Sequence, residues 1–127
     1  MDELESIPSP RFFSATEDIE ENSLDLNRYL VTHKSATFYL QMESDNLVEE
    51  GIHKHDLLVV DRSLSTGKTA IAVVDGELKA YKTSLKNKIL FLSNDFEQPF
   101  SLNQNDYIWG IVTAIIRKLW KETQYMH

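Results

Sequence analysis

The stretch that decides the fold runs from Thr69 to Thr83 and reads TAIAVVDGELKAYKT. It consists of two runs that contain apolar residues, separated by the pair Asp75-Gly76. Asp-Gly favours a tight two-residue turn between antiparallel strands, because both positions of that turn have positive φ angles. The stretch therefore predicts a β-hairpin with strands at 69–75 and 77–83.

Other runs on either side of this hairpin also predict strands. In residues 36–42 (ATFYLQM) an apolar side chain occupies every second position, which is typical of a half-buried strand. We expect the last strand to bend or bulge at Gly110, and a helix is the alternative for its C-terminal half. The remaining predicted strands are 56–61, 88–93 and 107–119, and turns such as 65–68 separate them.

One short helix and an N-terminal arm precede the predicted strands. Ser23 or Asp25 can cap a helix whose Leu26, Tyr29, Leu30 and His33 share one face. Residues 1–22 are rich in acidic side chains and predict an extended, mobile arm. The fold class we expect is mainly β, with a flexible arm at 1–22 and one β domain at 23–127.

Composition restricts the function classes. The 127 residues fit one domain, and the absence of cysteine excludes disulfides and a thiol nucleophile. A formal net charge of −7 argues against a direct grip on nucleic acid. No apolar run approaches the roughly 20 residues of a membrane span, and the acidic N-terminus is unlike a signal peptide. We expect a cytoplasmic protein without a membrane anchor.

Two weak motifs suggest ligand sites that we do not expect to form. The segment Ser65-Thr-Gly-Lys-Thr69 resembles the end of a phosphate-binding loop, but Arg62 stands where that loop needs glycine. His53 and His55 are two residues apart and could bind zinc together with His33, yet no fourth ligand follows from the spacing. The sequence predicts no metal and no cofactor.

Several short segments, in the same order, resemble the UmuD-type members of the LexA-like self-cleaving Ser–Lys peptidases (peptidase S24). The segments are 7–10 (IPSP), 25–61 (DLNRYLVTHKSATFYLQMESDNLVEEGIHKHDLLVVD), 74–78 (VDGEL), 92–94 (LSN) with Pro99, and 108–112 (IWGIV). Together they cover about residues 7–119. The resemblance implies the LexA and signal-peptidase β fold.

The resemblance also locates the two catalytic positions of the family. The loop with the family's serine nucleophile falls on Ser44–Leu47, so that Asn46 occupies the nucleophile position. The family's general-base lysine falls on Tyr81, and a phenol with an ordinary pKa near 10 is a poor base at neutral pH. The resemblance therefore implies a degenerate, non-catalytic member. Ser44 and Lys82 are poor substitutes, because a shift of one residue in a strand reverses the side chain's direction.

The implied function is that of a UmuD′-like subunit. The chain begins near the point where the family's cleaved product begins, and it contains no Ala-Gly or Cys-Gly bond. By resemblance we expect a homodimer that binds an error-prone Y-family DNA polymerase, or a RecA filament, in translesion synthesis during the SOS response. Leu78, Phe96 and Trp109 match the family's dimer contact, although Trp109 could instead fill the monomer core.

Two alternatives remain open from the residues alone. A pseudopeptidase could pair with UmuD- or LexA-type proteins and regulate them, encoded for example by a phage or mobile element. A shifted peptidase could use Ser44 and Lys82, in which case incubation at alkaline pH would shorten the arm. A polymerase gene adjacent to this gene favours the UmuD′-like subunit, and neighbouring repressor or phage genes favour the regulator.

Overall fold

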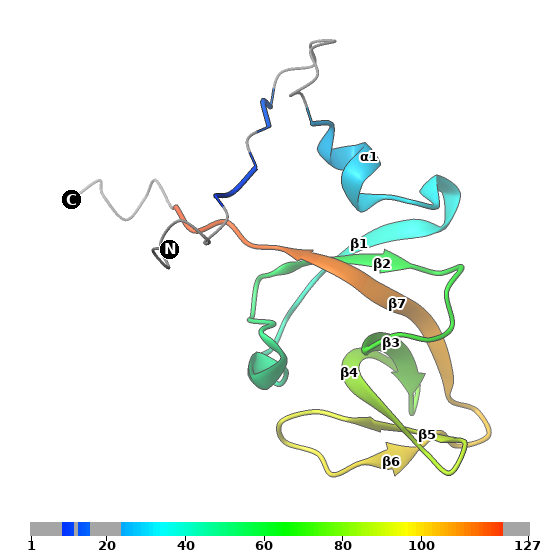
Figure 1. Ribbon diagram of the computed structural model, residues 1–127. Helices are drawn as coiled ribbons and strands as arrows, with labels where there is room; N and C mark the ends of the chain where they lie inside the picture. Colours follow the sequence, from blue (N-terminus) through cyan, green and yellow to red (C-terminus); the bar gives the residue numbers. More distant parts are fainter. Residues whose placement is uncertain (1–8, 12, 16–23, 121–127) are drawn as a thin grey trace, which may run out of the picture.

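The computed structural model describes residues 9–11, 13–15 and 24–120, and within them the fold is mainly antiparallel β (Figure 1). Seven strands form one sheet in the order β1-β2-β7-β3-β4-β5-β6, which confirms the predicted fold class. The elements are α1 (Leu26–Leu30), η2 (Lys34–Ala36), β1 (Thr37–Gln41), η3 (Val48–Glu50), β2 (Leu57–Asp61), β3 (Thr69–Val74), β4 (Glu77–Lys86), β5 (Ile89–Ser93), β6 (Phe100–Ser101) and β7 (Tyr107–Ile116). The predicted arm, 1–22, lies mostly outside the described residues.

The β3–β4 hairpin forms as its sequence predicts. Asp75 and Gly76 have φ angles of 52° and 79°, the conformation of a two-residue hairpin turn whose twist matches the strands. A second turn of this kind, at Asn87 and Lys88, joins β4 to β5 with φ angles of 51° and 68°. Sequence analysis missed it and ended the strand too early, because Asn-Lys lacks the glycine that marks such turns.

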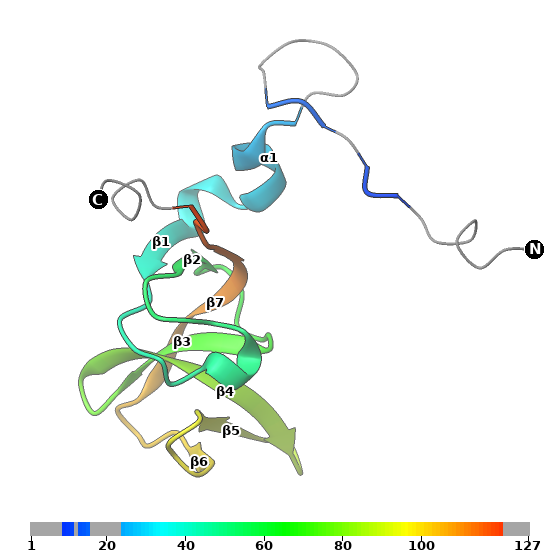
Figure 2. The same ribbon diagram turned by 90° about the vertical axis from the view of Figure 1, so that its left-hand side faces the viewer.

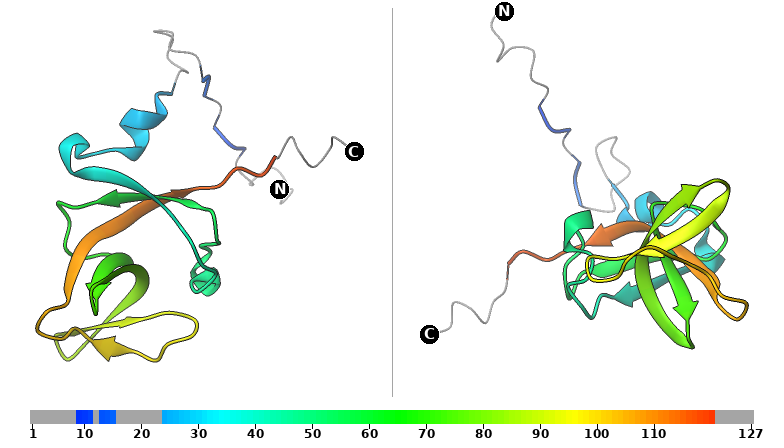
Figure 3. Two further views of the ribbon diagram at one scale, coloured as in Figure 1. Left: turned by 180° about the vertical axis from the view of Figure 1, so that it is seen from behind. Right: turned by 90° about the horizontal axis from the view of Figure 1, so that it is seen from below.

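Strand β7 holds the two parts of the sheet together. It pairs antiparallel with β2 along one edge and with β3 along the other, and Figure 3 shows it crossing the whole body. The helix that we considered for its C-terminal half is wrong, since Ile115 and Ile116 pair with β2. Strand β7 has two bulges: Trp109 has no partner in the pairing with β3, and Thr113 has none in the pairing with β2. The bulge that we expected at Gly110 therefore lies one residue earlier, at Trp109.

Helix α1 is shorter than its sequence pattern suggested. Asp25 caps it, with its Oδ1 accepting the Asn27 N–H at 3.0 Å, whereas Ser23 lies outside the described residues. The helix ends at Leu30, so that His33 follows it and does not share its face. None of its residues is buried, and Figure 2 shows it beyond the end of β1. In the described residues no helix has the length and apolarity needed to cross a membrane.

The core divides into two clusters of apolar side chains, and β4 contributes to both. The first cluster contains Met42, Leu47, Ile52, Leu58, Val60, Ile71 and Ala80. The second contains Ala72, Tyr81 and Leu92, with Phe100, Leu102 and Ile108 packed against it. Because neighbouring strand residues point to opposite faces, Ala80 enters the first cluster and Tyr81 the second.

An ion pair between buried Asp56 and exposed Arg117 fixes the end of β7 to the loop before β2. Arg117 donates from Nε to Asp56 Oδ1 at 2.6 Å and from Nη2 to Asp56 Oδ2 at 2.7 Å. The same Nη2 bonds the Gly51 carbonyl, and the His53 N–H bonds Asp56 at 2.7 Å. These partners, the Arg117 guanidinium foremost, lower the pKa of the buried Asp56 carboxyl from 3.8 to about 2.

Candidate functional site

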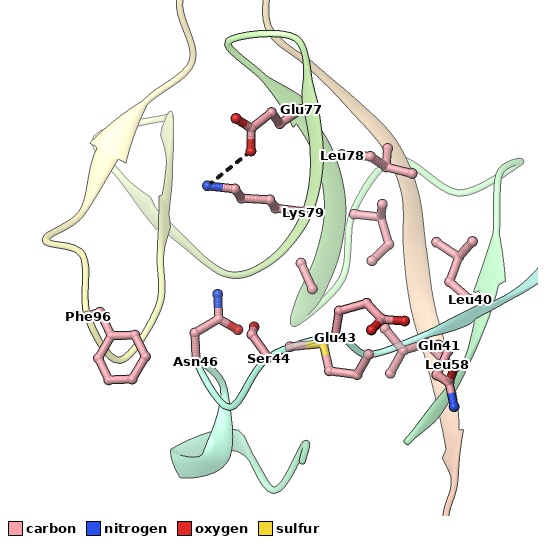
Figure 4. A pocket seen from close by; sticks show the side chains of 13 residues that line it. Leu40, Gln41, Glu43, Ser44, Asn46, Leu58, Glu77, Leu78, Lys79 and Phe96 are labelled. Atoms are coloured by element: carbon pink, nitrogen blue, oxygen red, sulfur yellow. Dashed lines mark ion pairs between the residues drawn. The ribbon is translucent and has the colours of Figure 1, made fainter. Parts of the chain in front are cut away.

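A cavity of about 510 Å³ lies between the loop after β1 and the start of β4, and Asn46 and Ser44 both line it (Figure 4). Apolar side chains such as Leu40, Leu58 and Leu78 form much of its wall. Its rim is polar. The first core cluster holds this loop in place, because Met42 and Leu47, on either side of Ser44–Asn46, are buried.

Asn46 has an unusual setting in this cavity. Its backbone carbonyl accepts the Asp95 N–H at 2.8 Å, which ties the loop to the end of β5. Its side-chain Oδ1 is buried, and in the described part of the chain it has no hydrogen-bond partner. A buried, unpartnered amide oxygen normally carries a cost in free energy, so its place in a cavity favours a role in binding a donor. An amide cannot form an acyl-enzyme as a serine hydroxyl does.

Tyr81 is almost fully enclosed, with 1% of its surface exposed, and it is not among the residues that line the Asn46 cavity. Its ring meets Phe100 edge-on, with 5.4 Å between the ring centroids. Burial raises the pKa of the Tyr81 phenol above its ordinary value of 10.0, and the nearby Glu97 carboxylate adds to the shift. The phenol therefore stays neutral and protonated at neutral pH, which is the wrong state for a general base.

The two potential substitutes do not form a dyad in this structure. Ser44 lines the cavity, whereas Lys82 does not. The Lys82 ammonium lies 3.9 Å from Glu50 Oε1, in the turn η3 that follows the Asn46 loop. The Lys82 side chain is about half exposed and is held beside this carboxylate, outside the cavity that Ser44 lines.

Sequence analysis missed the lysine that does line the cavity. Lys79 lies two residues before Tyr81, and Figure 4 shows it beside Glu77, whose Oε2 is 3.6 Å from the Lys79 ammonium. The sequence pattern alone does not place it there, because Lys79 and Tyr81 share a face of β4 while Tyr81 lies outside this cavity. An exposed ammonium paired with a carboxylate is suited to binding and not to taking a proton from serine.

The three predicted interface residues have different settings. Phe96 is 79% exposed and Leu78 is 47% exposed, and both line the rim of the Asn46 cavity. Trp109 is half-buried and packs against the first core cluster. Its ring lies 5.5 Å from that of Phe38, and the Arg62 guanidinium lies 4.3 Å above it. Trp109 therefore contributes to the monomer core, while Phe96 and Leu78 offer free apolar surface.

The histidines considered for zinc do not converge. His33 Nδ1 instead lies 2.5 Å from Asp61 Oδ2 and 3.1 Å from Ser63 Oγ. Both contacts use the same ring nitrogen, so that these residues lack the relay of a Ser–His–Asp triad, which uses both nitrogens. Within residues 9–11, 13–15 and 24–120, no group of three metal-ligating side chains is found.

Comparison with known proteins gives consistent matches over most of the chain. The family model described as Peptidase S24-like matches residues 10–113. Protein SamA of Salmonella typhimurium is 36% identical over 109 residues, which are 84% of this chain and 78% of SamA. Protein MucA of Escherichia coli is 32% identical over 111 residues, or 83% of this chain and 76% of MucA. The LexA repressor of Clostridioides difficile is 30% identical over 89 residues, or 65% of this chain and 42% of the repressor.

Proposed function

The chain belongs to the peptidase S24-like family, as its motifs predicted, and from this premise we propose that it is a non-catalytic, UmuD′-like dimeric subunit. Its partner would be an error-prone Y-family DNA polymerase, and its role would be in SOS translesion synthesis. The similarity to SamA and MucA over most of each chain supports this choice within the family.

The observation that carries the non-catalytic part of the proposal is the chemistry of the two family positions. Asn46, at the position that the resemblance gives to the nucleophile, lines the 510 Å³ cavity, and Tyr81, at the position that it gives to the general base, is a buried neutral phenol outside that cavity. The Asn46 amide cannot form an acyl-enzyme as the family's serine does, and the protonated Tyr81 phenol cannot accept a proton as the family's lysine does. The lysine that does line the cavity, Lys79, is held by Glu77 as an ion pair.

Incubation at about pH 10, where lysine amines become neutral, tests the loss of catalysis. The intact mass of the wild-type chain should stay unchanged over days. A self-cleaving LexA-type repressor incubated in parallel is the positive control for the assay. Shortening of the wild-type chain, abolished in Ser44→Ala, would overturn the proposal and establish a shifted peptidase.

The dimer part of the proposal is supported by the exposed Phe96 and Leu78 on one rim. Large apolar side chains at an interface centre commonly carry much of its binding energy. Sedimentation of Leu78→Glu and Phe96→Glu should show a weaker dimer than the wild type. Leu85→Glu is a matched control, because Leu85 is 70% exposed on the same strand but lies away from this rim.

Co-purification tests the polymerase part directly. A tagged chain expressed in DNA-damaged cells should retain a Y-family polymerase, and Phe96→Glu should reduce the amount retained. Damage-induced mutagenesis that is the same with and without the gene would contradict the proposal.

A second candidate is a pseudopeptidase regulator that forms heterodimers with UmuD- or LexA-type proteins. The similarity to a LexA repressor over 65% of this chain favours it, because related β domains can present matching edges. Mixing the chain with a labelled LexA-type protein should then produce a heterodimer and change the rate of that protein's self-cleavage. Capture of the polymerase without such a heterodimer would select the first function.

A further inference from the structure

A second, smaller cavity of about 250 Å³ lies on the face of the sheet that holds Tyr81. It is surrounded by the β3–β4 turn, the segment between β5 and β6, and the segment leading into β7. Its size is slightly below the usual range of small-molecule sites, roughly 300–1,000 Å³, which suits a single side chain. The lining residues are Val74, Asp75, Glu77, Lys79, Tyr81, Glu97, Phe100, Asn103 and Asp106.

The lining is strongly acidic. Four carboxylates and one ammonium, that of Lys79, give it a formal excess of three negative charges. Internal contacts satisfy part of this set: Asp106 accepts the N–H groups of Asp75 at 3.1 Å and Asn103 at 2.9 Å. Glu97 Oε2 accepts from Asn94 Nδ2 at 2.8 Å, and Glu77 pairs with Lys79. Carboxylate oxygens remain available at the rim.

Tyr81 supplies an independent sign of a ligand. Its side chain is 99% enclosed and lines this cavity, and among the described residues its hydroxyl has no hydrogen-bond partner. The hydroxyl is not one of the fully buried polar atoms that lack a partner, so the small exposed part of the residue includes this oxygen, which is open to a ligand or to water. Burial raises the pKa of the phenol, and the negative charges of Glu97, Glu77, Asp106 and Asp75 raise it further.

The geometry favours an extended, planar cation. Across the described residues, the carboxylates do not gather into a cluster of metal-ligand spacing. Acceptors spread around a cavity match the guanidinium group, which carries five N–H donors in one plane and stacks on aromatic rings. The edge-to-face pair of Tyr81 and Phe100 provides such rings in the wall.

We propose that this cavity is a binding site for a guanidinium group, presented as an arginine side chain by a protein partner. The carboxylates of Glu97 and Glu77 face the cation, the Tyr81 hydroxyl accepts one N–H, and the Phe100 ring covers one side. This site goes beyond the proposed function. It can be tested on the isolated chain, so its failure would leave the dimer and polymerase proposals untouched.

The test is an NMR titration of the ¹⁵N-labelled chain with N-acetyl-arginine amide, and with the citrulline compound as its uncharged match. The arginine compound should bind with a dissociation constant of about 1 mM and shift the amide signals of residues 97–106. Glu97→Gln should weaken binding about tenfold, because a charge-assisted hydrogen bond becomes a neutral one. Tyr81→Phe should weaken it about threefold while preserving the fold.

Glu49→Gln is the control, since it removes one exposed negative charge from a side chain that lies outside the cavity. Its affinity for the arginine compound should equal that of the wild type. Equal binding of the citrulline compound would overturn the proposal, as would equal weakening by Glu49→Gln and Glu97→Gln. Shifts that map away from residues 97–106, or full displacement by calcium chloride at matched ionic strength, would overturn it as well.

Discussion

Replacing Asp56 by asparagine tests how much the contact between β7 and the preceding loop stabilises the fold. Ionised Asp56 accepts two hydrogen bonds from Arg117 and one from the His53 N–H, and its pKa is about 2 in the folded state against an ordinary 3.8. This difference corresponds to about 2.4 kcal/mol of unfolding free energy at neutral pH. The Arg117 side chain is 38% exposed, so solvent screening reduces the expected loss to about 1–2 kcal/mol.

The sign of the pH dependence follows from the lowered pKa. A carboxyl whose folded-state pKa lies below its unfolded value stabilises the fold fully above the unfolded pKa, here 3.8. The contribution falls to about half near pH 3 and is almost lost near pH 2. The wild type should therefore be more stable than Asp56→Asn at pH 7, and the difference should shrink as the pH falls through this window.

Urea unfolding at about pH 7 and about pH 2.5, followed by circular dichroism, measures both free energies. Glu49→Gln is the matched control for the loss of one negative charge, and it should change the stability by less than about 0.5 kcal/mol. A stability difference between wild type and Asp56→Asn that is the same at both pH values would refute the reasoning. So would a variant as stable as the wild type at neutral pH.

Three shorter predictions concern the core and the His33 contact. Gly110→Ala should lower the free energy of unfolding by about 1–3 kcal/mol, measured by thermal unfolding, because the new Cβ would lie 2.7 Å from Val60 Cγ1. Adding Val60→Ala to this variant should restore part of the lost stability. Tyr81→Ala should cost about 3–5 kcal/mol in urea unfolding, whereas Tyr81→Phe should cost less than about 1 kcal/mol; equal losses would show that the hydroxyl, and not the ring, stabilises the core. Ser63→Ala should raise the pKa of Asp61, which Ser63 and then His33 hold below its ordinary 3.8, and carboxyl NMR would show an unchanged pKa if this is wrong.

Local signals account for much of the fold. Asp75-Gly76 placed the central hairpin, since a turn with two positive φ angles is a property of those two residues. Asn87-Lys88 forms the same turn without glycine, so that only the pairing of Leu85 with Leu90 around it reveals it. The short strand β6 has just two residues, too few for a period to be recognised.

The sequence by itself determined the β class, the hairpin, the family motifs and the residue types at positions 46 and 81, because each is a matter of local pattern or identity. The tertiary structure alone placed Lys79 in the Asn46 cavity and joined Asp56 to Arg117 across 61 residues. It also collected Asp75, Glu97 and Asp106 around the cavity that Tyr81 lines. These contacts join residues that are distant in sequence, so they depend on strand register and on the path of the loops. Local sequence patterns specify neither.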